Sequence, residues 1–219
     1  MAELSIAISA AETVSAILER PPAARAMLVL AHGAGAGMRH RFMNQLAAAL
    51  GERGVATLRY HFPYMEAGRR RPDRPALLEA TVRAAVAEAA RRAGDLALFA
   101  GGKSMGGRMT SQAQAAEPLP GVRGLVFAGF PLHPPGAPAT ARAEHLARVR
   151  VPMLFLQGTR DELAGLDLLQ PIVLRLPHAF LDVVDGADHS FALPAAQARI
   201  RSPVAELADA AAGWMAALA

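Results

Sequence analysis

Five short apolar runs, with helix-like segments between them, constrain the fold of this chain more than any other feature. Nearly continuous hydrophobicity is typical of strands that are buried on both faces of a sheet. The runs cover residues 26–32, 55–61, 96–102, 124–130 and 152–158. Between them, apolar residues recur at helical spacing, and these segments end near Gly51, Gly94 and Pro118. This alternation predicts an α/β fold with a mostly parallel sheet and helices on both faces.

Both ends of the chain add to this sheet. Residues 4–21 alternate well enough between polar and apolar to predict an edge hairpin of two strands, and residues 179–191 predict a final strand and loop. Ser202 as N-cap and Pro203 at the first helical position then begin a last helix. Because 219 residues with 53% hydrophobic content suffice for one sizeable core and not for two, we expect a single domain over residues 1–219.

Composition removes several classes of function. The net charge is only +4 and aromatic residues make up 5% of the chain, so we expect no nucleic acid partner. No apolar run approaches the ~20 residues that span a bilayer, and the first residues lack the basic stretch of a signal peptide. We therefore expect no membrane partner and a cytoplasmic location. The absence of cysteine excludes disulfides, thiol chemistry and cysteine-type zinc sites.

The segment FAGGKSMGGRM, residues 99–109, has two incompatible interpretations. A phosphate loop of a nucleotide-binding protein has the pattern G-x-x-x-x-G-K-[ST], which here requires glycine at position 97. That residue is Ala97, inside an apolar run, and the next run ends without the aspartate that would hold magnesium. The phosphate-loop interpretation therefore fails.

The competing pattern, G-x-S-x-G, is complete from Gly102 to Gly106 and lies between an apolar strand and an amphipathic helix. This setting predicts a nucleophile elbow, a tight turn in which Ser104 takes a strained backbone conformation and glycines leave room around it. Such a turn exposes the hydroxyl at a helix N-terminus, where free N–H groups favour developing negative charge. The alternative, an ordinary glycine-rich turn, is weaker in this setting.

A serine hydroxyl becomes a nucleophile when a histidine takes its proton and an acid orients that histidine. Asp161 follows the fifth apolar run and His189 follows the last predicted strand, which is the chain order of the α/β-hydrolase triad. Glu162 is the alternative acid if the loop is shifted by one residue. The loop that carries His189 holds two further aspartates, which are predicted to cap it: Asp185 and Asp188.

The segment AHGAGAGMRH, residues 31–40, supplies a fourth part. It fails as a dinucleotide-binding G-x-G-x-x-G pattern, because the third glycine would fall at Met38. As a loop after a hydrolase strand it predicts an oxyanion hole, in which the backbone N–H groups of Ala34 and Met105 bind the carbonyl oxygen. His32 is expected to orient this loop by hydrogen bonding. The alternative is a flexible turn into a helix.

Four motifs together resemble the α/β-hydrolase superfamily over essentially the whole chain: LAHGAGAG, GGKSMGGRM, FPLHPPG and QGTRDEL. More narrowly, they resemble a small bacterial family of serine hydrolase-like proteins. That family is related to dienelactone hydrolases and to subunit 3 of the eukaryotic NSL chromatin acetyltransferase complex. The resemblance implies a triad of Ser104, Asp161 and His189 and an eight-stranded core. Dienelactone hydrolases use a cysteine, which this chain lacks, so their substrate does not simply transfer.

The sequence therefore predicts a serine hydrolase that cleaves small ester-like substrates, carboxylic esters or lactones, through an acyl-enzyme without metal or organic cofactor. The segment at 131–150 is too short for a large lid, so we expect an open or shallow site. The residues predicted to bind substrate are His32, Gly33, His61, Lys103 and His133. The alternative function is a hydrolase fold retained as a non-catalytic protein-interaction module.

Two basic features have more than one interpretation. Lys103, the only lysine, is expected to contact either the acyl or leaving group or a neighbouring loop. The arginine run at 69–71 could attract an acidic substrate or partner, or form solvated surface. The sequence carries no firm signal for the oligomeric state.

Overall fold

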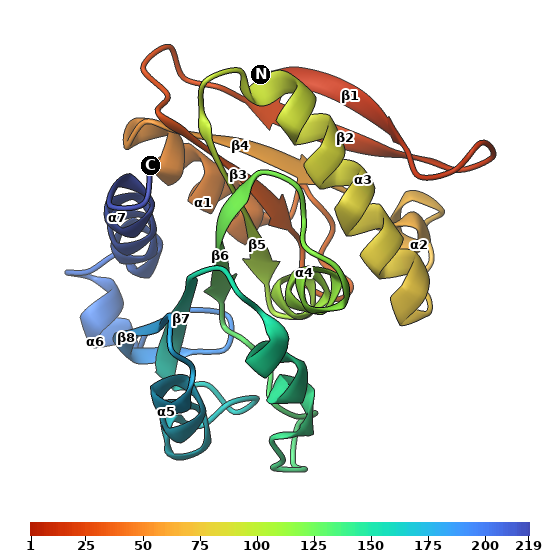
Figure 1. Ribbon diagram of the computed structural model, residues 1–219. Helices are drawn as coiled ribbons and strands as arrows, with labels where there is room; N and C mark the ends of the chain where they lie inside the picture. The colour runs from red at the N-terminus through yellow and green to blue at the C-terminus, as the bar shows by residue number, and fades with distance from the viewer.

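An eight-stranded sheet forms the middle layer of the structure, a computed structural model that describes residues 1–219 (Figure 1). The strand order is β1-β2-β4-β3-β5-β6-β7-β8. The strands are β1 (Ala2–Ala7), β2 (Thr13–Glu19), β3 (Ala26–Ala31), β4 (Val55–Tyr60), β5 (Ala97–Lys103), β6 (Val122–Ala128), β7 (Met153–Arg160) and β8 (Ala179–Asp188). The hairpin of β1 and β2 is antiparallel at one edge, β2 is antiparallel to β4, and all other pairs are parallel. The predicted hairpin and the eight-stranded, mostly parallel sheet are confirmed.

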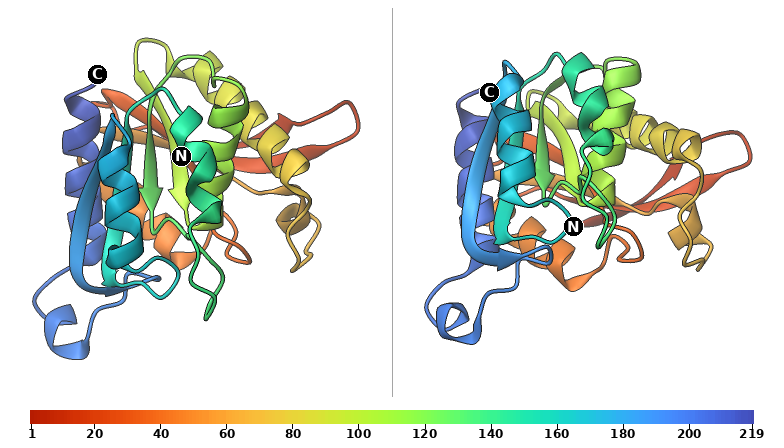
Figure 2. Two further views of the ribbon diagram at one scale, coloured as in Figure 1. Left: turned by 60° about the horizontal axis from the view of Figure 1, so that its bottom comes forward. Right: turned by 90° about the horizontal axis from the view of Figure 1, so that it is seen from below.

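Helices cover both faces of this sheet, as predicted. The helices are α1 (Arg41–Glu52), α2 (Pro63–Glu66), α3 (Pro75–Ala93), α4 (Met105–Ala116), the 3₁₀ helix η1 (Ala141–Arg148), α5 (Leu166–Arg175), α6 (Ala195–Ala198) and α7 (Pro203–Ala216). Figure 2 shows α7 on one side of the sheet and α4 on the other. Buried residues of α1 and α7 belong to one core cluster, and those of α3 and α4 to the other. No helix combines the length and the apolar character that a membrane crossing requires.

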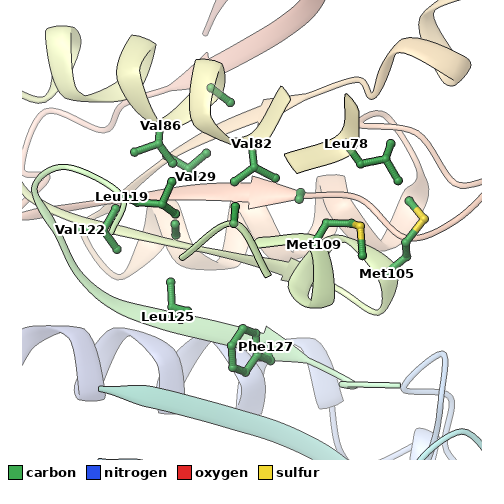
Figure 3. Packing of buried hydrophobic residues seen from close by; sticks show 14 of the residues in the cluster. Val29, Leu78, Val82, Val86, Met105, Met109, Leu119, Val122, Leu125 and Phe127 are labelled. Carbon is green, nitrogen blue, oxygen red and sulfur yellow. The ribbon is translucent and has the colours of Figure 1, made fainter. Parts of the chain in front are cut away.

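Strand β3 shows why the apolar runs are continuous. Met27, Val29 and Ala31 belong to the core beneath α3 and α4, whereas Leu28 and Leu30 belong to the core beneath α1 and α7. Since side chains alternate between the faces of a strand, a strand covered on both faces has no solvent-facing positions to favour polar residues. Figure 3 shows the first of these cores, with side chains of α3 and α4 packed over those of β3 and β6.

The segment between β6 and β7 contains only η1, in keeping with the expectation of no large lid. Helix α5, between β7 and β8, was not predicted. It carries Pro171 in its interior, a residue that usually ends a helix, and only Leu169 and Val173 of α5 are buried. Its apolar residues do recur at helical spacing, with Leu168, Ile172 and Leu176 packed against the core, but the proline obscures the helix in the sequence. The last helix was predicted correctly: Ser202 caps α7 by accepting the N–H of Ala205, and Pro203 follows it.

Two helical glycines differ sharply in the space around them. A Cβ added at Gly106, in the first turn of α4, would lie 2.5 Å from Ala31 O and 2.6 Å from His32 O. A Cβ added at Gly213, in α7, would meet no atom within 4 Å. The first glycine therefore allows α4 to approach the end of β3, whereas the second has no such role.

We predict that Gly106→Ala lowers the free energy of unfolding by about 3 kcal/mol or more, because the backbone of β3 must move to admit the methyl group. The matched control Gly213→Ala should raise it by about 0.5–1 kcal/mol, since alanine restricts the unfolded chain at a compatible position. Urea unfolding followed by circular dichroism measures both. Equal effects of the two substitutions would contradict this account of α4 packing.

Candidate active site

Ser104 occupies a sharp turn between β5 and α4. Its backbone has φ 51° and ψ −118°, a left-handed conformation that costs a residue with a side chain roughly 1–3 kcal/mol. Neighbouring glycines make this turn sterically feasible: a Cβ at Gly102 would lie 2.4 Å from Ala31 O, and one at Gly107 would lie 2.8 Å from Gly102 O. The backbone geometry is that of the strained elbow that the G-x-S-x-G pattern predicts.

A continuous chain of hydrogen bonds runs from this serine across the carboxyl end of the sheet. Ser104 Oγ lies 2.9 Å from His189 Nε2, and His189 Nδ1 lies 2.8 Å from Asp161 Oδ2. Asp161 comes from the loop after β7 and His189 from the loop after β8, so parallel strands bring the three side chains to one edge. With Nδ1–H donating to the carboxylate, Nε2 is left as the acceptor for the serine hydroxyl.

The carboxylate of Asp161 is completely buried and held by two further donors. Gln157 Nε2 donates to Oδ2 at 2.6 Å, and the Leu163 N–H donates to Oδ1 at 2.8 Å. Gln157 is itself oriented by the Phe130 N–H, which donates to its Oε1 at 3.1 Å. Glu162, the alternative acid, is exposed and makes none of these contacts. Gln157 was not predicted as part of the site, although a glutamine within an apolar run is an available signal.

The turn that carries His189 is held by its own side chains. Asp188 Oδ1 accepts the N–H groups of Ser190 at 2.8 Å and Ala192 at 2.9 Å, which agrees with its predicted capping role. Phe191 has a left-handed φ of 60°, and its ring stacks on Phe42 with 5.7 Å between centroids. The strained turn is therefore fastened both by the Asp188 carboxylate and by the aromatic stack. Asp185 lies outside the turn and accepts a weak hydrogen bond from Thr159.

His32 fixes the loop after β3 through two hydrogen bonds. Its Nε2 accepts the Phe62 N–H at 3.1 Å and its Nδ1 donates to Gly33 O at 2.7 Å, so both ring nitrogens are used. Burial lowers the pKa of His32 to about 4. Tyr64 supports the same loop by accepting the Gly35 N–H at 3.1 Å. The expectation that His32 orients this loop is in agreement with these contacts.

The Ala34 N–H has no acceptor within the protein. The Met105 N–H belongs to the first residue of α4, where helix geometry supplies no intrahelical acceptor. Both residues flank Ser104, one through the loop after β3 and the other as its successor in the chain. Their role as donors to a ligand oxygen stays a prediction.

A hollow of about 360 Å³ opens at Ser104 and His189, and Gly33, Ala34 and Lys103 also line it. Three histidines predicted to bind substrate lie outside the hollow, so their contact with substrate stays a prediction. His32 is fully buried under the loop, as described above. No group of three or more His, Cys, Asp or Glu side chains is arranged to hold a metal ion.

The other two histidines are also engaged elsewhere. His61 borders a separate hollow beside β1 and β2, and its Nδ1 accepts the Met38 N–H at 3.4 Å. His133 is buried, and its Nδ1 donates to Pro134 O at 2.9 Å. Each follows a strand, as predicted, but each side chain is directed to a nearby backbone group.

The two basic features have distinct settings. Lys103 extends to the loop of β8, where its Nζ donates to His189 O at 2.6 Å, as the loop-contact interpretation predicts, and it also lines the hollow, so a contact with substrate stays a prediction. The arginine run at 69–71 is exposed, and Arg69 pairs with Asp73 at 2.7 Å. It borders none of the hollow at Ser104.

Comparison with known proteins identifies the family. Residues 24–216 match the family described as "Alpha/beta hydrolase domain", which is most of the chain. The chain therefore belongs to the α/β-hydrolase family, and the resemblance to this superfamily is confirmed. The narrower relationship to subunit 3 of the NSL complex stays a prediction.

Solved structures share the fold over nearly the whole chain. A serine hydrolase homologue from Coxiella burnetii is 18% identical, with a TM-score of 0.75 over 97% of this chain and 96% of that chain. The dienelactone hydrolase of Anabaena variabilis is 19% identical, with a TM-score of 0.77 over 99% and 97%. An α/β serine hydrolase without lid from Xanthomonas campestris is 18% identical, with a TM-score of 0.69 over 87% and 86%.

The buried neutral His32 makes stability depend on pH. Its folded-state pKa of about 4 lies below the ordinary 6.5, so the unfolded chain binds a proton first as pH falls. Stability should be complete above pH 6.5 and decrease between pH 6.5 and 4. At about 1.4 kcal/mol per pKa unit, His32 contributes on the order of 3 kcal/mol to this decrease.

Urea unfolding at pH 7, 6, 5 and 4 measures this dependence. The variant His32→Asn, which cannot titrate, should be less stable at pH 7 and should lose part of the pH dependence. An identical pH dependence in the variant and the wild type would show that His32 is not held neutral by the fold.

Proposed function

We propose that this member of the α/β-hydrolase family is a serine hydrolase that cleaves small carboxylic esters or lactones through an acyl-enzyme. The observation that carries the proposal is the hydrogen-bonded chain from Ser104 through His189 to Asp161 at the edge of a hollow. In this interpretation Ser104 is the nucleophile, His189 the general base and Asp161 the acid that orients the imidazole.

The first half-reaction forms the acyl-enzyme. His189 Nε2 takes the Ser104 hydroxyl proton as Oγ attacks the carbonyl carbon, and the carbonyl electron pair moves onto oxygen. The Asp161 carboxylate, 2.8 Å from Nδ1, stabilises the imidazolium that results. When the tetrahedral intermediate collapses, its C–O bond to the leaving group breaks and the imidazolium Nε2–H protonates the departing alkoxide. In a lactone this alkoxide stays attached to the acyl group.

The negative oxygen of that intermediate needs donors that are already in position. We assign this role to the N–H groups of Ala34 and Met105, at the N-terminus of α4. Support comes from the unpaired state of the Ala34 N–H and from the hydrogen bonds of His32 and Tyr64, which hold the loop that presents it. Preorganised donors of this kind reduce the reorganisation that the reaction would otherwise require.

The second half-reaction restores the serine. Water enters the hollow and loses a proton to His189 Nε2 as it attacks the acyl carbon. The intermediate then collapses with release of the carboxylic acid, and Ser104 Oγ recovers its proton from the imidazolium. The two half-reactions together consume only the ester or lactone and one water molecule.

The proposed substrate class follows from the size and cover of the hollow. A volume of about 360 Å³ lies at the small end of ligand pockets, and only the short η1 segment separates β6 from β7. A small or exposed ester group fits this space better than a long buried acyl chain. The structural neighbour from Anabaena variabilis is a dienelactone hydrolase, which supports the inclusion of lactones.

We predict that a fluorophosphonate probe labels the wild type and not Ser104→Ala, because the probe reacts with an activated serine. Gel fluorescence and intact mass spectrometry measure the labelling, and circular dichroism checks that the variant is folded. Aryl esters with acyl chains of two to eight carbons should then be hydrolysed fastest at the short end. Absence of labelling in folded wild type would favour the non-catalytic interaction module instead.

Asp161 and its exposed neighbour Glu162 provide a matched pair of carboxylates. Asp161→Asn should lower kcat/KM by about 10³- to 10⁴-fold, because the amide favours the wrong tautomer of His189. Glu162→Gln should change kcat/KM by less than about twofold, since its side chain is exposed and does not contact the imidazole. The reverse order of effects would assign the acid to Glu162.

A further inference from the structure

The only lysine of the chain lies against the proposed general base. Lys103 immediately precedes the nucleophile, and its Nζ donates to His189 O at 2.6 Å. The same Nζ is 3.3 Å from His189 Nε2, the atom that accepts the Ser104 hydroxyl at 2.9 Å. The proposed mechanism assigns no role to this amine.

Lys103 Nζ and the Ser104 hydroxyl are two donors that face one acceptor, His189 Nε2. Since Nδ1–H is directed to Asp161, a neutral imidazole has a single lone pair, on Nε2. An ammonium group has three donors and no acceptor, so a charged Lys103 competes with the serine hydroxyl for that lone pair. It also opposes formation of the imidazolium, because the two positive charges would be only 3.3 Å apart.

A neutral amine has the opposite effect. Without its extra proton, Lys103 Nζ carries a lone pair of its own and is a weak donor, so it leaves Nε2 to the serine. Once the proton reaches Nε2, the amine can accept the new N–H. The proton state of Lys103 therefore decides whether the group beside the base hinders or assists proton transfer.

Two aromatic rings and a glycine surround Lys103 Nζ. The centroids of the Phe42 and Phe191 rings lie 6.0 and 5.4 Å from Nζ. Gly129 provides the necessary space, because a Cβ there would lie 3.0 Å from Nζ and 3.5 Å from the His189 ring.

Burial and the neighbouring carboxylates have opposite effects on the pKa of Lys103. Burial lowers the pKa of Lys103 to about 8, against the effect of the carboxylates of Asp161 and Asp188, which raise it. The other titratable groups nearby are the imidazoles of His189 and of His40, which lines the same hollow. Burial of the ammonium therefore moves the ionisation of Lys103 toward neutral pH.

We propose that Lys103 is a positioning residue that controls access of Ser104 to His189 Nε2, its ammonium form occupying that nitrogen and its amine form releasing it. This inference rests on the proposed function, since it concerns activation of the same serine. It implies a hydrolase whose serine becomes more reactive as the solution turns mildly alkaline.

The test is the ratio of fluorophosphonate labelling rates at pH 9 and pH 7, with Ser104→Ala as the background. For the wild type the ratio should be about tenfold, as a lysine pKa of about 8 requires. Lys103→Met should give a ratio near one, because its side chain does not titrate. Lys103→Arg keeps a permanent cation, so its ratio should also be near one, and its labelling rate should be low at both values of pH. The charge control Arg41→Met, on the exposed start of α1, should keep the wild-type ratio.

A ratio is informative even where a substitution loosens the loop, because a purely structural loss lowers both rates together. Equal ratios in labelled wild type and Lys103→Met would overturn the inference and leave the hydrolase proposal intact. Absence of labelling in every protein would overturn both.

Nuclear magnetic resonance gives an independent readout. Protein grown with ¹³C-lysine has a single lysine Cε signal, because the chain contains one lysine. The midpoint of its titration should coincide with the rise in the wild-type labelling rate. A midpoint above about pH 10, the range of an exposed lysine, would overturn the inference without reference to activity.

Discussion

The hydrogen bond between Ser104 Oγ and His189 Nε2 is the interaction on which the rest of the site depends. It joins residues 85 positions apart, and two strands, β6 and β7, lie between those that carry them. The ordered sheet places the loops after β5 and β8 close enough for this contact of 2.9 Å. The two residues with side chains in the left-handed region, Ser104 and Phe191, flank this bond, so local strain is concentrated where the fold most strongly determines the backbone.

Hydrogen-bonded polar groups around this bond, buried except for Asp188, explain its geometry. Asp161 is fixed by Gln157, the His189 turn by Asp188, and the loop after β3 by His32. Each of these residues uses its hydrogen-bonding atoms on backbone or on a reacting group, which is the condition under which buried polarity is tolerated. Lys103 differs, because its ammonium shares an acceptor with the serine. The site therefore combines a rigid framework with one amine whose pKa is lowered by burial to about 8.

Much of this could be predicted from the sequence, for a physical reason. Strands buried on both faces leave continuous apolar runs, and residues directly after such runs reach one edge of a parallel sheet, which is why Ser104, Asp161 and His189 could be predicted to lie together. The same reasoning does not extend to His32, His61 and His133, which follow strands but lie outside the hollow, because position after a strand does not determine which backbone group a side chain meets. Helix α5 was missed because Pro171 interrupts its pattern, and Gln157 and the contact of Lys103 depend on distances between strands.

A crystal structure of the protein after reaction with a small phosphonate ester would test the central claim most directly. The phosphonyl group mimics the tetrahedral intermediate, so its position reports the nucleophile and the oxyanion donors together. The account predicts a bond from phosphorus to Ser104 Oγ and a phosphonyl oxygen about 2.7–3.1 Å from the N–H nitrogens of Ala34 and Met105. Phosphorus attached to another residue, or its oxygen directed away from both N–H groups, would contradict it.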